Sequence, residues 1–252
     1  MKLAAYSLAV SLIATAAAAA PVDLSTWVQD GDGDWELAAD NQSVFQDINS
    51  RPTTYHNNQA LSQGKSLSGT ITVSSPPGDD DWIGFVLGYT QGDIGGSNTG
   101  IDYLLIDWKG VSQGGWDAGL ALSRVAGDID VSATATNSDP WDHVGDVQFL
   151  TRSNVVGSQY GTTGWTAGTT YTFDLEFTAS NVKVYIDGIL EIDYEGAFAD
   201  GAFGFYNYSQ PNVTYAGITE DVILDPVPLP AGLPLLLAGL GAFGLLRRRA
   251  RA

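Results

Sequence analysis

Three adjacent carboxylates, Asp79, Asp80 and Asp81, form a group whose residue type and spacing suggest a chemical task. They follow Pro76-Pro77-Gly78 and precede the apolar run Trp82–Tyr89, an order that predicts a loop leading into a buried strand. Carboxylates this close repel one another at neutral pH unless water or a cation offsets their charge. Because divalent cations such as Ca²⁺ prefer oxygen ligands of this kind, the run is either a cation-bridged loop or a solvated turn.

A second acidic pattern consists of Asp30, Asp32 and Asp34, which alternate with glycine. Their spacing matches ligand positions 1, 3 and 5 of an EF-hand loop. Trp35 and Asn41 stand where such a loop needs glycine and glutamate, which excludes a standard EF-hand. The pattern therefore makes these residues candidates for a weaker calcium turn, although a polar hairpin tip is the favoured interpretation.

Glu191, Asp193 and Glu195 alternate along a predicted strand, so that three carboxylates share one face. This spacing resembles the Glu-x-Asp-x-Glu strand of lichenase-type β-glucanases. The resemblance implies that Glu191 and Glu195 act as the nucleophile and the acid/base of a retaining mechanism. The motif lies on the second arm of a tight hairpin, with little of the domain after it. We therefore expect exposed acids on the outer face of the hairpin and no catalysis.

Other catalytic and metal-binding patterns are scarce. The chain has no cysteine and only two histidines, His56 and His143, which excludes disulfides, thiolate sites and a histidine-rich zinc site. No GxSxG elbow or P-loop occurs. A Ser-His-Asp set would need His143, but nothing marks a nucleophile. The loop Asp139–His143 has loose metal-ligand character, with a solvated loop as the alternative.

The charge of the chain is strongly negative, with a formal net charge of −18. All 29 acidic residues lie within Pro21–Pro226, together with six basic ones. Such an excess argues against nucleic acid or anionic lipid as a partner. It is compatible with divalent cations or with a need for solubility outside the cell.

Strand signals dominate the region 21–220, because β-branched and aromatic residues alternate in short runs between turn residues. This pattern predicts an all-β domain, an antiparallel two-sheet jelly-roll sandwich of the concanavalin A-like type. The segment Asp30–Asn58 is expected to supply opening strands. The main strands are expected at Leu67–Val73, Ile83–Tyr89, Ile101–Lys109, Gly119–Val125, Val147–Leu150, Tyr171–Thr178, Val182–Ile186, Ile189–Tyr194, Phe203–Tyr208 and Val213–Ile218.

Within this pattern, Asp187-Gly188 predicts a two-residue hairpin turn, since both positions favour a positive φ. Four tryptophans (Trp108, Trp116, Trp141 and Trp165) are candidates for stacking on sugars. Aromatic side chains in a sandwich are more often packed in the core, and we expect this of Trp108 and Trp165.

The chain from Leu67 onward resembles the C-terminal domain of thrombospondins, which has a legume lectin-like sandwich. The likeness is carried by the runs Asp79–Tyr89, Tyr103–Lys109 and Gly201–Gln210. It implies the sandwich fold, a calcium-stabilised loop at Asp79–Asp81 and a non-catalytic, adhesive or structural role outside the cell. The cysteine-containing calcium repeats and the Arg-Gly-Asp motif are missing, so binding to animal receptors is not implied. The alternative is a lectin-like module that binds extracellular polysaccharide on its concave sheet.

The start of the chain predicts export. Met1-Lys2, the apolar stretch Leu3–Ala14 and the small residues Ala16–Ala20 have the order of a secretory signal peptide over residues 1–20. We therefore expect a helical signal segment that signal peptidase removes. Because Pro21 is an unfavourable first residue, cleavage after Ala18 or Ala19 is an equal alternative to cleavage after Ala20.

Residues 227–252 predict sorting to the cell surface. A short motif is followed by the uncharged apolar run Leu233–Leu246 and a basic end. This order resembles the PEP-CTERM signals of bacteria, in the variant spelled VPLPA, which are read by membrane peptidases called exosortases. The resemblance implies a transmembrane helix at 233–246 that anchors the chain transiently, with the basic end in the cytoplasm; an unprocessed tail anchor is the alternative. Residues 221–226 are the expected linker. The motif comprises Val227, Pro228, Leu229, Pro230 and Ala231, and the basic end comprises Arg247, Arg248, Arg249 and Arg251.

Overall fold

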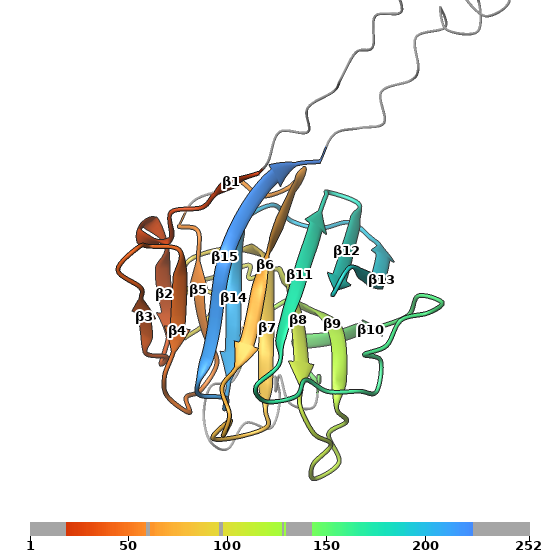
Figure 1. Cartoon of the computed structure of the whole chain (residues 1–252). Coiled ribbons are helices and arrows are strands. Elements are labelled where there is room, and N and C mark those ends of the chain that lie inside the picture. Colours follow the sequence, from red (N-terminus) through yellow and green to blue (C-terminus); the bar gives the residue numbers. More distant parts are fainter. Residues whose placement is uncertain (1–18, 59–60, 96–97, 128, 130–142, 224–252) are drawn as a thin grey trace, which may run out of the picture. The chain divides into compact units, whose positions relative to one another are not determined.

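The computed structural model describes residues 19–58, 61–95, 98–127, 129 and 143–223 (Figure 1). The predicted sorting signal with its helix 233–246 lies outside these residues, as do residues 1–18 of the predicted signal peptide and residues 139–142. Among the described residues, no helix is long and apolar enough to cross a membrane. The chain divides into two units, Met1–Val222 and Ile223–Ala252, and all described strands belong to the first.

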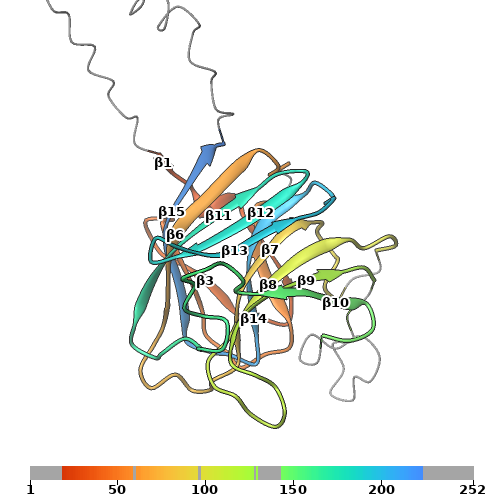
Figure 2. The same cartoon turned by 90° about the vertical axis from the view of Figure 1, so that its right-hand side faces the viewer.

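Two antiparallel sheets make up this unit, as the sequence predicts (Figures 1 and 2). The eight-stranded sheet has the order β13-β12-β11-β6-β15-β4-β3, with β1 paired to β15. Its strands are β13 (Ile189–Glu195), β12 (Asn181–Ile186), β11 (Thr170–Phe177), β6 (Lys65–Val73), β15 (Val213–Val222), β4 (Ser43–Gln46), β3 (Trp35–Leu37) and β1 (Ala20–Pro21).

The seven-stranded sheet has the order β10-β9-β8-β7-β14-β5-β2. Its strands are β10 (Val147–Arg152), β9 (Gly119–Val125), β8 (Tyr103–Lys109), β7 (Trp82–Tyr89), β14 (Ala202–Tyr208), β5 (Thr53–His56) and β2 (Val28–Gly31), and a short 3₁₀ helix spans Leu24–Thr26. All ten main strands expected from the sequence are present, and the segment Asp30–Asn58 supplies the opening strands as expected. β15 runs to Val222, so the sheet extends two residues into the expected linker 221–226.

The main core lies between the sheets, and alternation of side chains places it there. Val182, Val184 and Ile186 of β12 are fully buried, whereas Lys183 and Tyr185 face the other way. Trp108 and Trp165 are buried in this core, which confirms their expected role. A second apolar cluster covers the other face of the seven-stranded sheet, so every residue of β7 is buried.

Turn chemistry determines how β12 leads into β13. Asp187 and Gly188 have φ values of 50° and 75°, which gives the predicted two-residue turn with Ile186 opposite Ile189. The strand register then shifts between Val184 and Tyr185, where β13 contains one additional residue.

Strand register also defines the two ends of the sandwich. β6 begins opposite Val222 of β15, and Ala20 of β1 lies opposite Glu220, so β1 and the last residues of β15 lie together at one end (Figure 1). The connections β5–β6, β7–β8 and β13–β14 converge there. The β6–β7 connection, which carries Asp79–Asp81, lies at the opposite end.

Candidate functional site

A polar cleft opens at the end of the sandwich where β7 finishes and β14 begins. It consists of two adjoining hollows, of about 370 Å³ and about 440 Å³, which share Thr90 and Asp200. We call it the end cleft. The first hollow is lined by His56, Asn58, Leu61, Tyr89, Thr90, Gln91, Asp200, Gly201 and Ala202, and the second by Gly88, Thr90, Asp93, Asn98, Thr99, Gly100, Asp102, Ala199 and Asp200.

His56 lies at the base of the end cleft, at the end of β5. Its side chain is only 1% exposed, and its Nδ1 atom has no hydrogen-bond partner among the described residues. Its Nε2 atom lies 3.4 Å from Asp30, and its ring lies 4.9 Å from that of Tyr89. Gly204 opposite allows β14 to approach this residue closely, because a Cβ atom there would come within 2.7 Å of His56 Cβ. The fold thus holds a buried imidazole nitrogen next to a cavity.

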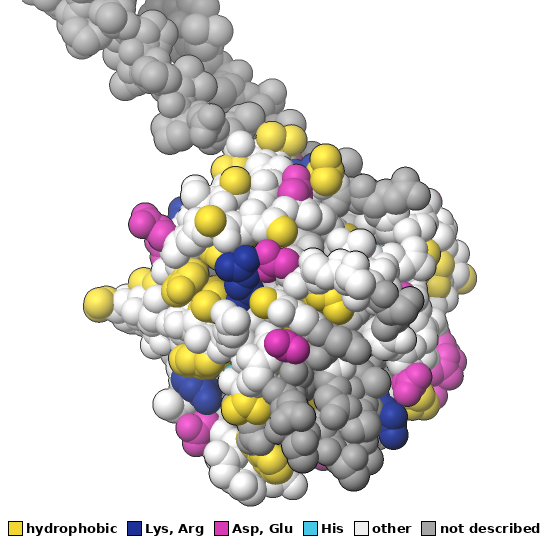
Figure 3. Space-filling view, turned by 180° about the vertical axis from the view of Figure 1, so that it is seen from behind, with side chains coloured by type: hydrophobic (Ala, Val, Ile, Leu, Met, Phe, Trp, Pro, Cys, Tyr) yellow, Lys and Arg dark blue, Asp and Glu magenta, His cyan; other side chains and the backbone are white. Residues whose placement is uncertain are grey.

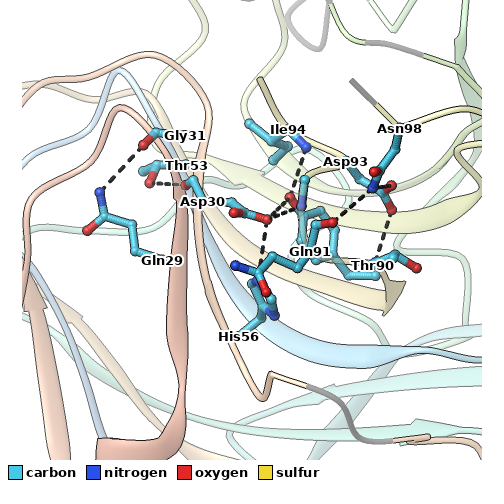
Figure 4. A network of polar contacts seen from close by, with 12 residues as sticks. Gln29, Asp30, Gly31, Thr53, His56, Thr90, Gln91, Asp93, Ile94 and Asn98 are labelled. Atoms are coloured by element: carbon cyan, nitrogen blue, oxygen red, sulfur yellow. Dashed lines mark hydrogen bonds and ion pairs between the residues drawn. The ribbon is translucent and has the colours of Figure 1, made fainter. Parts of the chain in front are cut away.

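Asp30 links β2 to the β7–β8 connection through hydrogen bonds. Its Oδ2 atom accepts hydrogen bonds from the Tyr89 hydroxyl at 3.0 Å and from the Gly92 N–H at 2.5 Å (Figure 4). Burial favours a higher pKa, but the nearby His56 ring and these donors outweigh it, and the pKa of Asp30 is lowered. The structure does not bring Asp30 together with the exposed Asp32 and Asp34, so calcium binding by this set stays a prediction.

Asp93 forms a second network beside the first (Figure 4). Its carboxylate accepts hydrogen bonds from the Thr90 N–H at 3.0 Å and from Asn98 Nδ2 at 2.9 Å. Burial raises the pKa of Asp93, because these neutral donors and the nearby His56 only partly offset the loss of water. The side chain is therefore a fixed, poorly solvated negative charge in the wall of the end cleft.

Two further carboxylates complete the wall. Asp200 Oδ1 accepts hydrogen bonds from the N–H groups of Ser62, Gln63 and Gly201, and this orients the side chain. Asp102 pairs with Arg124 through two hydrogen bonds, at 2.7 and 2.6 Å. Asp102 is thus neutralised by a guanidinium, whereas Asp200 is held only by backbone groups.

The predicted calcium loop at the opposite end is ordered by amide side chains. Asn49 donates to Asp79 Oδ2 at 2.6 Å, and the Asp81 N–H donates to Gln210 Oε1 at 3.0 Å. The amide of Gln210 also donates to the Pro77 carbonyl. One carboxylate oxygen from each of Asp79, Asp80 and Asp81 lies within 4.8 Å of the others, and no other such group of three occurs among the described residues.

Lys109, at the end of β8, is the functional neighbour of this loop that sequence reasoning missed. Its ammonium lies 2.6 Å from Asp81 Oδ1, 3.6 Å from Asp80 Oδ1 and 4.1 Å from the centre of the Trp82 ring. The side chain is 1% exposed. Only the register that pairs Trp82 with Lys109 brings these groups together. The loop therefore carries three negative charges and one built-in positive charge.

Glu191 is buried, and the expectation that it lies exposed on the hairpin is wrong. The residue sits at the register shift of β13, which turns its side chain inward while Asp193 and Glu195 stay exposed. Its carboxylate accepts hydrogen bonds from the Ser153 hydroxyl and from the N–H groups of Gln159 and Tyr160. These hydrogen bonds hold the β10–β11 connection against β13. Because Glu191 is buried and Glu195 is exposed, the two carboxylates lie on different faces and do not form a catalytic pair.

His143 pairs with Asp107, a residue of β8 that is 1% exposed. The His143 Nε2 atom lies 2.7 Å from Asp107 Oδ2, and the ring of Phe149 lies 5.7 Å from the imidazole. This pair places the imidazole next to a buried carboxylate of β8.

The comparisons with known proteins agree with this architecture. Residues 30–222 match the family model described as "Thrombospondin C-terminal region". No protein with a curated description matches the chain.

Two solved structures share the fold. A carbohydrate-binding module, CBM66 from Bacillus subtilis, has 12% identity and a TM-score of 0.51, covering 78% of this chain and 95% of its own. The exoplasmic/lumenal domain of VIP36, in a Ca²⁺/Man2-bound form, has 13% identity and a TM-score of 0.53, covering 81% of this chain and 84% of its own. Since the family model covers most of the chain, the protein belongs to the thrombospondin C-terminal region family.

Proposed function

We propose that this protein is a non-catalytic carbohydrate-binding module and that the end cleft holds the sugar. The observation that carries the proposal is His56, which is buried beside the cleft with an unsatisfied Nδ1 atom. A buried polar atom without a partner is costly, and a ligand hydroxyl that reached it would recover that cost. The proposal favours a glycan because the lining combines hydroxyl, amide and carboxylate groups.

The likeness to CBM66 and to the mannose-bound VIP36 domain supports the same class of ligand. Glycan binding would give the protein an adhesive or structural role in the cell envelope or the extracellular polysaccharide matrix. Surface proteins are the other candidate partners.

Binding of the full chain to a glycan array, followed by titration of the best oligosaccharide, tests the proposal. The chain should be kept in a polyoxyethylene detergent, since a sugar-based detergent could compete. Replacing His56 by Phe keeps a ring but removes both nitrogens, and should weaken binding at least about tenfold, the equivalent of ~1.4 kcal/mol. Gln91→Ala and Asn58→Ala alter the rim without touching the core, and Val156→Ala, at a fully exposed site away from the cleft lining, is the control. Unchanged affinity in all cleft variants would place the sugar elsewhere.

The proposal excludes glycoside hydrolysis by Glu191 and Glu195. Glu191 is buried and engaged by three donors, so it lacks the access that a nucleophile or acid/base needs. Turnover of mixed-linkage glucan by the purified chain, abolished by Glu191→Gln, would contradict this.

We propose in addition that Asp79, Asp80 and Asp81 bind calcium. The proposal rests on the short separation of their oxygens and on the charge: three carboxylates and the Lys109 ammonium leave two negative charges, which a divalent ion balances. Its test is the melting temperature in chelator and in millimolar calcium, where binding at ~100 times the dissociation constant adds ~2.7 kcal/mol. The increase should disappear in Asp80→Asn and persist in Asp32→Asn. An increase lost only in Asp32→Asn would move the site to the Asp30–Asp34 turn, and none at all would make the loop a solvated turn with an internal counter-ion.

Export completes the proposal. Signal peptidase would cleave after Ala18, Ala19 or Ala20, and an exosortase would process the motif 227–231, so that the domain acts outside the cell. Fractionation of cells that produce the chain with and without residues 227–252 tests this. Equal surface display of both forms would count against the sorting signal.

A further inference from the structure

The end cleft carries negative charge with little positive charge to balance it. Asp93, Asp102 and Asp200 line the larger hollow, and no lysine or arginine is among its described lining residues. Arg124 neutralises Asp102 from the side. Asp93 and Asp200 are held by neutral donors alone, and Asp200 Oδ2 accepts no hydrogen bond among the described residues.

Most lysines and arginines elsewhere on the domain are paired with carboxylates, as Arg124 is with Asp102. Among the described residues, five of the six lysines and arginines of the domain lie within 4.0 Å of a carboxylate; the five are Lys65, Lys109, Arg124, Arg152 and Lys183. In the view from behind, dark blue side chains lie beside magenta ones (Figure 3). An anionic ligand that approached the end cleft would therefore meet few unpaired positive charges, and like charges at an interface oppose binding.

The buried imidazole adds an observation independent of the acids. His56 is 1% exposed and lines the hollow that shares Asp200 with the larger one. Its Nδ1 atom has no hydrogen-bond partner among the described residues, and a hydrogen-bonding group of the occupant that reached it would supply one. A ligand that satisfies both features presents a hydroxyl toward His56 and a positive charge toward Asp200 and Asp93.

We propose that the end cleft selects glycans whose hexosamine units carry a free, protonated amine, over N-acetylated, neutral and uronic acid-containing glycans. This inference rests on the proposed function and specifies its ligand class. An amino sugar carries hydroxyl groups and an ammonium on one small ring. These groups are complementary to the unpartnered nitrogen of His56 and to the carboxylates of Asp200 and Asp93. The ammonium would pair with Asp200 Oδ2 and would gain from the field of the buried Asp93.

Calorimetric titration of the full chain in polyoxyethylene detergent tests the selectivity. The probes are hexamers of glucosamine, N-acetylglucosamine, glucose and galacturonic acid. We expect the glucosamine hexamer to bind about two- to fivefold more tightly than the N-acetylated one for each amine–carboxylate pair. The preference should shrink when ionic strength is raised from roughly 20 mM to roughly 500 mM.

Asp200→Asn separates a specific pair from general attraction to an acidic protein. The amide keeps an oxygen for the three N–H groups but removes the charge, so the preference for free amines should fall while the neutral hexamer still binds. Glu36→Gln, at an exposed site on β3, changes the net charge equally and should leave the preference intact. Equal loss in both variants, or tighter binding of the N-acetylated or uronic hexamer, would overturn the selectivity while leaving carbohydrate binding in place. No binding of any hexamer would overturn both proposals.

Discussion

The ammonium of Lys109 lies 2.6 Å from Oδ1 of Asp81, and both side chains are almost completely buried. Burial alone raises the pKa of Asp81 more than Lys109 lowers it, so the carboxylate remains a costly charge even with its partner. The pair joins the end of β8 to the start of β7 and lies against the Trp82 ring.

Removing Lys109 should therefore destabilise the domain far more than removing a surface lysine. We expect Lys109→Met to lower the free energy of unfolding by about 3–5 kcal/mol, because it leaves the charge of Asp81 buried without a partner. Lys183→Met, which breaks the half-exposed pair with Glu176, should cost less than about 1 kcal/mol. Urea denaturation measures both. The double variant Asp81→Asn/Lys109→Met should recover part of the loss, and a strictly additive double variant would contradict the coupling.

Glu191 should prove to be a structural anchor. Glu191→Ala leaves the part-buried N–H groups of Gln159 and Tyr160 without their acceptor, and the two losses together should cost about 1–3 kcal/mol. We expect a loss of stability of this order, together with faster proteolysis within the β10–β11 connection. Glu195→Ala, at an exposed site on the same strand, is the matched control. Equal protease resistance of the two variants would show that the connection does not depend on Glu191.

Asp93 and Asp30 should affect the pH dependence of stability with opposite signs. Burial raises the pKa of Asp93 above 3.8, so the folded state binds this proton more tightly than the unfolded state, and stability falls as pH rises from 3.8 through the folded-state pKa. The pKa of Asp30 is lowered despite its burial, so its contribution is present above 3.8 and is lost as pH falls through the folded-state pKa.

Unfolding titrations in urea across this pH range check both signs. Asp93→Asn should flatten the decline above pH 3.8, and Asp30→Asn should flatten the loss below it. Curves for Asp93→Asn that run parallel to those of the parent chain would contradict the first assignment.

Gly84 should tolerate no side chain. A Cβ atom there would lie 2.0 Å from the Ile106 carbonyl oxygen on β8, and both the N–H and the carbonyl of Gly84 contact the Tyr215 hydroxyl. We expect Gly84→Ala to cost about 3 kcal/mol or more, because two core strands must separate. Gly64→Ala has a positive φ of 81° but open space around it, and should cost only about 1 kcal/mol. Thermal unfolding distinguishes the two, and similar melting temperatures would refute the steric argument.

The fold was predictable because its signals are local. Alternation of apolar residues identified all ten main strands, and Asp187-Gly188 specified its own turn. The sites depend on relationships between strands. Lys109 reaches Asp81 only through the register of β7 and β8, and a single additional residue in β13 turns Glu191 from the surface into the interior.

The end cleft was less predictable still. His56 carries no local mark of function, since its burial and its close approach to Gly204 arise from the pairing of β5 with β14. Asp30 followed a calcium-loop spacing in the sequence, yet pairing of β2 with β5 turns it toward Tyr89 and Gly92. The spacing of residues along the chain can suggest candidate ligands within one loop. The end cleft is built from the β5–β6, β7–β8 and β13–β14 connections, which are far apart in the sequence.

The pairing of β1 with β15 has a mechanical consequence. Where signal peptidase cleaves after Ala18 or Ala19, Ala20 remains and lies opposite Glu220 in an antiparallel pair, so tension applied between residues 20 and 222 would act across their hydrogen bonds. The two residue pairs between β1 and β15 would then separate first, and only afterwards would the longer pairing of β15 with β6 bear the force. The domain would yield at its margin under tension while its two sheets stayed packed.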